Sequence, residues 1–71
     1  MPAEIRAPMP GKIVQVLKSI GSQVNKGETI MIMEAMKMEM PVVANETGMI
    51  RDLPVKADEA VAKGAILVVI E

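Results

Sequence analysis

The fold is decided by a stretch that occurs twice in this chain of 71 residues. Residues 24–34 read VNKGETIMIME, and residues 61–71 read VAKGAILVVIE, 37 positions later. The match extends upstream without a gap, since Gly11 falls on Gly48 at the same shift. Two copies are too few for a solenoid. The repeat therefore predicts one domain with two similar halves and a pseudo-two-fold core.

Each half contains the same short apolar segments between turn residues. The halves cover about residues 4–34 and 41–71 of a single domain, residues 1–71. Apolar runs of this length, separated by Gly, Pro and Asn, are typical of strands in all-β sandwiches and barrels. The strands are expected at residues 4–7, 12–17, 29–33, 42–44, 49–53 and 66–70.

The composition of residues 28–40 favours a helix over a strand, because Met, Glu, Ala and Lys are good helix formers. The repeat decides between the two structures, since the corresponding residues 66–70 are mostly β-branched and favour a strand. Pro41 would in addition end any helix just before it. We therefore expect strands in both halves.

Four glycines recur in register and are predicted to be structural turn glycines: Gly11, Gly27, Gly48 and Gly64. For Gly27 and Gly64, which close the repeated Val-x-Lys-Gly segments, the expected reason is a turn that needs a positive φ.

The composition excludes several classes of function. The chain contains no His, Cys, Trp, Tyr or Phe and has a net charge of −1. Cys/His metal sites, Ser-His or Cys-His nucleophiles and aromatic stacking platforms are therefore excluded, and no nucleic-acid partner is expected. The longest apolar run, residues 65–70, is too short to span a bilayer, and the N-terminal residues do not resemble a signal peptide. We expect no membrane insertion and a cytoplasmic location.

Residues 35–40 lie between the halves and have no counterpart in the repeat. They are predicted to form a tight hairpin with Met36 and Lys37 at its tip. Two-residue hairpin turns favour Asn-Gly or Asp-Gly because both central residues take a positive φ. Two long side chains break this rule, and such a local conflict points to function.

Several interpretations of this tip remain open from the residues alone. Lys37 is either an ordinary solvated lysine or an amine that another protein recognises and modifies; an exposed tip does not favour a catalytic lysine. Met31 and Met33 are expected to fill the core. The Met36-x-Met38 spacing also suits Cu(I), although no His or Cys accompanies the thioethers.

The segment Glu34-Ala35-Met36-Lys37-Met38 resembles the attachment motif of biotinyl domains, the biotin carboxyl carrier modules of biotin-dependent enzymes. The similarity covers nearly the whole chain, including residues 7–11, 24–27 and 46–48. The resemblance implies a flattened barrel-sandwich hybrid of two four-stranded antiparallel sheets. It also implies a non-catalytic carrier with biotin in amide linkage to Lys37.

The resemblance further implies the partners of the domain. A biotin protein ligase would recognise Glu34, Ala35, Met36 and Met38 and modify Lys37. Biotin carboxylase and carboxyltransferase (or decarboxylase) subunits or domains would then load and unload the carboxyl group. The mitochondrial matrix is the alternative to the cytoplasm if the domain is excised from a longer eukaryotic protein.

Two features depart from the pattern or refine it. Asp58 stands where the family often has Gly, and because Asp tolerates left-handed geometry the turn is expected to survive. The gap-free match of the halves leaves no room for the protruding loop of some acetyl-CoA carboxylase carriers.

Two alternatives to a biotinyl domain are considered. One is a lipoyl domain, whose tip typically has Asp before the lysine and Ala or a related small residue after it. The other is an unmodified interaction scaffold.

Overall fold

The computed structural model describes residues 2–71, and in this range the chain forms eight strands and no helix. The strands are β1 (Ala3–Arg6), β2 (Gly11–Val16), β3 (Gln23–Val24), β4 (Thr29–Ala35), β5 (Met38–Val43), β6 (Gly48–Asp52), β7 (Ala60–Val61) and β8 (Ile66–Ile70). The all-β prediction is confirmed, including strands rather than a helix in residues 29–43. No membrane-crossing helix is found in the described range.

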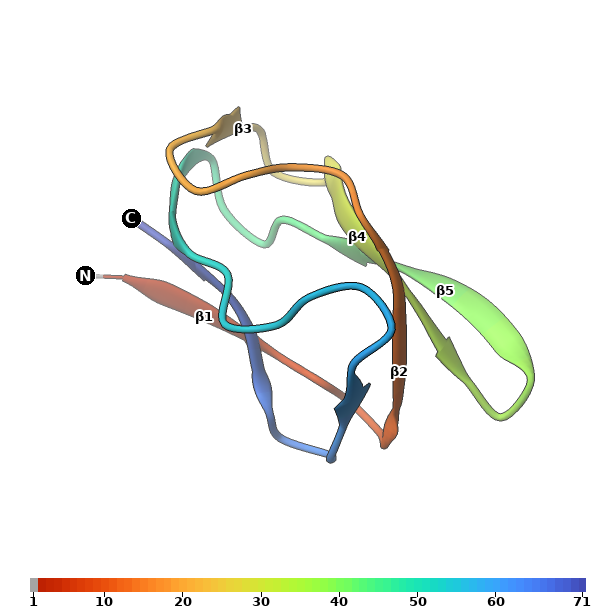
Figure 1. Ribbon diagram of the computed structural model, residues 1–71. Helices are drawn as coiled ribbons and strands as arrows, with labels where there is room; N and C mark the ends of the chain where they lie inside the picture. Colours follow the sequence, from red (N-terminus) through yellow and green to blue (C-terminus); the bar gives the residue numbers. More distant parts are fainter. Residues whose placement is uncertain (1) are drawn as a thin grey trace.

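The strands form two four-stranded antiparallel sheets, as predicted. One sheet has the order β1-β8-β6-β3, and the other has the order β5-β4-β2-β7 (Figure 1). A shift of 37 residues takes β1 to β5, β2 to β6, β3 to β7 and β4 to β8, and it converts the first order into the second. Each sheet therefore contains strands from both halves, and neither half makes a sheet by itself.

Backbone hydrogen bonds between the halves follow the same symmetry. The Gly21 N–H donates to the Ile50 carbonyl at 2.8 Å, and the Asp58 N–H donates to the Ile13 carbonyl at 2.7 Å. Each bond becomes the other when the halves are exchanged. Each bond gives a loop amide of one half a carbonyl partner in the other half. The two halves therefore hold each other's loops in place.

The core lies between the sheets and consists of aliphatic and methionine side chains. Met31 and Met33 are fully buried, as predicted for core-filling methionines. A register shift between Thr29 and Met31 accompanies the burial of two consecutive side chains, Ile30 and Met31, in one strand. The other fully buried large side chains are Ile13, Val24, Ile50, Leu67, Val68 and Ile70. Each such side chain contributes about 1.5–3 kcal/mol relative to an exposed one.

Two of the four predicted turn glycines lie in left-handed turns. Gly27 and Gly64 have φ values of 91° and 86°, which confirms the expected reason for glycine there. Asp58, the counterpart of Gly21, has a φ of 71°, so the turn does survive with a non-glycine residue.

The prediction is wrong for the other pair, because Gly11 and Gly48 are the first residues of β2 and β6 and do not lie in turns. Their reason is a close approach of another strand. A Cβ atom at Gly48 would lie 2.7 Å from the Glu71 carbonyl oxygen, and one at Gly11 would collide with the Glu34 carbonyl oxygen. Glycine is needed at these two positions for space.

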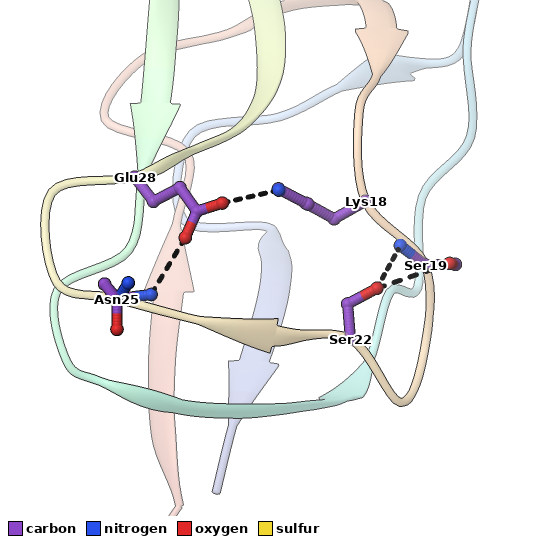
Figure 2. Close-up of polar contacts among 5 residues, drawn as sticks. All are labelled: Lys18, Ser19, Ser22, Asn25 and Glu28. Atoms are coloured by element: carbon purple, nitrogen blue, oxygen red, sulfur yellow. Dashed lines mark hydrogen bonds and ion pairs between the residues drawn. The ribbon is translucent and has the colours of Figure 1, made fainter.

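A polar cluster fixes the loops at the start of β4, at the opposite end of that strand from the β4–β5 turn. Figure 2 shows Glu28 between Lys18 and Asn25: the Lys18 Nζ lies 2.5 Å from Glu28 Oε2, and the Asn25 N–H donates to Oε1 at 3.0 Å. The Ser19 N–H donates to Ser22 Oγ at 3.2 Å. The hydrogen bond from Lys18, followed by that from Asn25, lowers the pKa of the Glu28 carboxyl.

Candidate functional site

The candidate site is the turn of the β4–β5 hairpin. The register pairs Glu34 with Glu39 and Ala35 with Met38, which leaves Met36 and Lys37 as the two turn residues. The hairpin extends beyond the rest of the molecule, on the side away from both termini (Figure 1). The predicted tip is therefore present at the predicted residues.

Both turn residues have a left-handed backbone. Met36 has a φ of 53° and Lys37 a φ of 65°, the signs that a type I′ hairpin turn requires. For an L-residue other than Gly, Asn or Asp this conformation costs about 1–2 kcal/mol. The turn is therefore strained by its sequence, because neither position has the Gly, Asn or Asp that relieves this cost.

The side chains at the tip project into solvent. Met36 is 84% exposed and Met38 is 68% exposed, and Lys37 between them is also exposed. In the part of the chain that the structure describes, Lys37 takes part in no ion pair and no side-chain hydrogen bond. A primary amine is thus presented to solvent between two thioethers.

The residues just below the turn hold the tip in place. Ala35 is buried, and a Cβ atom at Gly11 would lie 3.1 Å from the Ala35 Cβ, so the absence of that atom lets β2 approach the end of the hairpin. Sequence reasoning placed Gly11 in a turn and missed this role. The distance along the chain between Gly11 and Ala35 hides the contact from any local pattern.

Charged side chains flank the tip on the two strands of the hairpin. Glu34 and Glu39 are exposed and directly opposite each other, a like-charge arrangement that weakens a hairpin. Lys12 on β2 is the register partner of Glu34 on its other side. Sequence analysis singled out Glu34 and missed Glu39, although the spacing of two residues on each side of the turn would have placed them opposite each other.

Away from the tip, an apolar groove of about 240 Å³ lies beside β1 and β5. Its walls include Ile5, Met40 and Val43. The one charged side chain in the wall, Arg6, donates to the Gly64 carbonyl at 2.9 Å and to the Glu4 carboxylate at 2.7 Å. No set of free polar groups converges there, so the groove does not have the make-up of an active site.

Fold and site together define a class of protein: a small β-barrel domain that presents one lysine on a strained, exposed hairpin. The model of the family described as "Biotin-requiring enzyme" matches residues 3–70. The chain belongs to this family. The predicted family and biotin as its cofactor are confirmed.

Relatives of known name agree with this assignment. The chain is 46% identical over 70 residues to pyruvate carboxylase of Bacillus subtilis, covering 99% of this chain and 6% of that protein. It is 41% identical over 64 residues to the biotin carboxyl carrier protein of Streptococcus mutans, covering 90% and 49%. A biotinylated protein (TB7.3 homolog) of Mycobacterium leprae is 31% identical over 70 residues, with 99% of both chains covered. The chain is thus a carrier domain, not a catalyst.

Solved structures give the same fold. Urea carboxylase of Kluyveromyces lactis matches with a TM-score of 0.92 at 27% identity, over 100% of this chain and 6% of that one. The lipoyl domain of the 2-oxoglutarate dehydrogenase complex of Azotobacter vinelandii matches with a TM-score of 0.84 at 26% identity, over 96% and 94%. The predicted barrel-sandwich fold is confirmed, and biotinyl and lipoyl domains share it.

The chain spans between 6% and 10% of the length of the first four curated relatives, which are all carboxylases or their subunits. The match therefore identifies the kind of domain, and it does not assign to this chain the activities of those longer proteins.

Proposed function

We propose that this domain is a biotin carboxyl carrier and that Lys37 holds biotin through an amide bond to its side-chain amine. The observation that carries the proposal is the β4–β5 turn, where Lys37 is exposed, unpaired among the described residues, and held at the apex by a left-handed backbone. A lysine that served only solubility would not need this strained position, because any surface strand offers a solvated site.

The residues at the tip fit a covalently held group. An attached group needs a free amine, open space around it and a turn that is held rigidly. Ala35 beneath the turn is buried and anchors the turn to the barrel. When bound, biotin supplies an atom that accepts a carboxyl group at one active site and releases it at another. The domain contributes the tether, because an attached group is delivered at an effective concentration set by its reach.

The tip also offers features that a biotin protein ligase can recognise. Glu34, Met36 and Met38 are exposed around Lys37, so a modifying enzyme can contact all three directly. Ala35 is only 4% exposed, so its contribution is to seat the turn against the barrel. We propose that the ligase reads these four residues together with the height of the lysine above the sheet.

The proposed partners follow from the relatives. Relatives of this chain are named as pyruvate, methylcrotonoyl-CoA and propionyl-CoA carboxylases. We propose that biotin carboxylase and carboxyltransferase (or decarboxylase) domains or subunits meet the same tip in turn, in the cytoplasm. After amide formation Lys37 carries no charge, so the tip then presents Met36, Met38 and a neutral arm to apolar pockets.

The fold does not distinguish biotin from lipoate as the attached group, because lipoyl domains share it. The residues at the tip favour biotin. Lipoyl tips typically carry Asp before the lysine, and Met36 occupies that position here. A thioether and a carboxylate differ in charge and in hydrogen-bonding capacity, so an enzyme that recognises one at the tip is not expected to accept the other.

The test is an intact-mass measurement after co-expression of the chain with a biotin protein ligase. We expect one biotin adduct on the wild type and none on Lys37→Arg. Lys26→Arg and Lys63→Arg are matched controls, because both lysines are exposed and each precedes a left-handed glycine, and both variants should keep the adduct. A lipoyl adduct, or an adduct that survives in Lys37→Arg, would contradict the proposal.

A further inference from the structure

The methionines of this chain differ sharply in exposure, and the two that flank Lys37 are the most exposed methionines among the described residues. Met36 and Met38 are 84% and 68% exposed, whereas Met31 and Met33 are 0% exposed. Met49, on β6 in the other sheet, is 44% exposed. The two most exposed thioethers among the described residues therefore flank the proposed attachment lysine directly.

We propose that Met36 and Met38 are sites of reversible oxidation by hydroperoxides, and that their oxidation slows biotinylation of Lys37. The part that concerns biotinylation rests on the proposed function. Solvent access governs how fast a thioether is oxidised, because the peroxide must reach the sulfur atom. The structure gives both tip sulfurs this access and denies it to the core pair.

The chemical step needs only a hydroperoxide. The sulfur lone pair attacks the terminal peroxide oxygen, the S–O bond forms and the O–O bond breaks. The sulfur is oxidised by two electrons, and the remaining oxygen leaves as an alcohol or water after it takes up the transferred proton. Methionine sulfoxide reductases reverse the step with a dithiol, which becomes a disulfide as the sulfoxide oxygen leaves as water.

The consequence arises from the change in polarity on both sides of the lysine. A sulfoxide is polar and chiral where the thioether is flexible and apolar. At Met31 or Met33 this change would disrupt the core, but these sulfurs are shielded. At Met36 and Met38 it leaves the fold intact, because neither side chain packs in the core, and it alters only the surface that a ligase contacts.

The first experiment maps oxidation on the unmodified chain. The protein is treated with hydrogen peroxide, the reaction is quenched with catalase, and a Glu-specific protease releases residues 35–39 for mass spectrometry. We expect Met36 and Met38 to be oxidised at least about tenfold faster than Met31 and Met33, with Met49 between them. Equal rates for tip and core methionines would overturn the proposal.

The second experiment measures the initial rate of biotinylation by a ligase that never meets the peroxide. We expect oxidised wild type to be modified about tenfold more slowly than untreated wild type, which corresponds to about 1.4 kcal/mol. Methionine sulfoxide reductases and dithiothreitol should restore the rate. An unchanged rate in protein whose tip methionines are fully oxidised would overturn the proposal.

Two variants assign the effect to the tip. Met49→Leu removes an exposed methionine elsewhere and should stay sensitive to peroxide. In Met36→Leu/Met38→Leu the tip cannot be oxidised, so its biotinylation rate should be the same before and after peroxide. A loss of rate in this double variant would refute control through the tip. Absence of biotin on untreated wild type would instead refute the proposed function, so the two failures are distinguishable.

Discussion

The strained turn predicts that the sequence at the tip sacrifices stability for function. We consider the double substitution Met36→Asn/Lys37→Gly, which installs the residues that a two-residue hairpin turn prefers. Met36 and Lys37 have φ values of 53° and 65°, and Gly adopts such values without steric cost. The variant should therefore be more stable than the wild type and unable to carry biotin.

The magnitude follows from three terms. Left-handed geometry costs about 1–2 kcal/mol at each of the two residues, and most of that cost is relieved. The greater conformational freedom of Gly in the unfolded chain opposes this gain by about 0.5–1 kcal/mol. Since Met36 is 84% exposed, the burial lost with its side chain is worth no more than about 0.5 kcal/mol. The net stabilisation is about 1–2 kcal/mol.

Urea unfolding followed by far-ultraviolet circular dichroism measures this gain, because the chain has no Trp or Tyr to serve as a fluorescence probe. With an m value of about 1 kcal/mol/M, the midpoint should rise by about 1–2 M. Asp58→Gly changes a left-handed residue away from the tip and is the control: because Asp tolerates its φ of 71°, the midpoint should not rise as it does in the turn variant, and biotinylation should be unchanged. A midpoint at or below that of the wild type in the turn variant would refute the strain argument.

Two further predictions concern the ends of β4. Lys18 holds the pKa of Glu28 below its usual value, so the stabilisation from ionised Glu28 is full above the usual pKa and is lost as the pH falls through the lowered one. Urea midpoints of wild type and Glu28→Gln should accordingly differ at neutral pH and converge in acid; a constant difference would contradict this. Gly11→Ala places a Cβ against the Glu34 carbonyl oxygen, and we expect a loss of about 1–3 kcal/mol in the free energy of unfolding and shifted amide resonances at the tip. Gly48→Ala should also destabilise but leave the tip resonances unmoved, because its neighbours lie in β8 and at the C-terminal residue.

The doubled sequence predicted much of the fold because each half supplied a check on the other. The helix-forming composition of residues 28–40 was overruled by the β-branched counterpart at 66–70, and the structure has strands in both places. Gly27 and Gly64 were likewise recognised as left-handed by their recurrence. Because the same segments occur twice, weak local preferences in one half could be checked against the other half, and the strands and left-handed glycines could be assigned.

What the sequence did not predict depends on contacts between segments distant along the chain. A repeat shows that two halves are alike, but it does not show that each sheet takes strands from both. The close approach of Gly11 to the end of β4 has no local signal. The pair formed by Lys18 and Glu28 arises only because two loops meet in the folded chain. Local patterns identified the tip, and tertiary contacts determine how it is supported.

The pairing of β1 with β8 has a consequence for how the domain can be joined to other proteins. Ala3 is the register partner of Ile70, so the two ends of the fold lie side by side, about 5 Å apart between Cα atoms. Such a domain can be grafted into a single surface loop of a host without forcing the loop open. Because the β4–β5 turn lies on the far side from both termini, the grafted lysine would face outward and remain reachable (Figure 1).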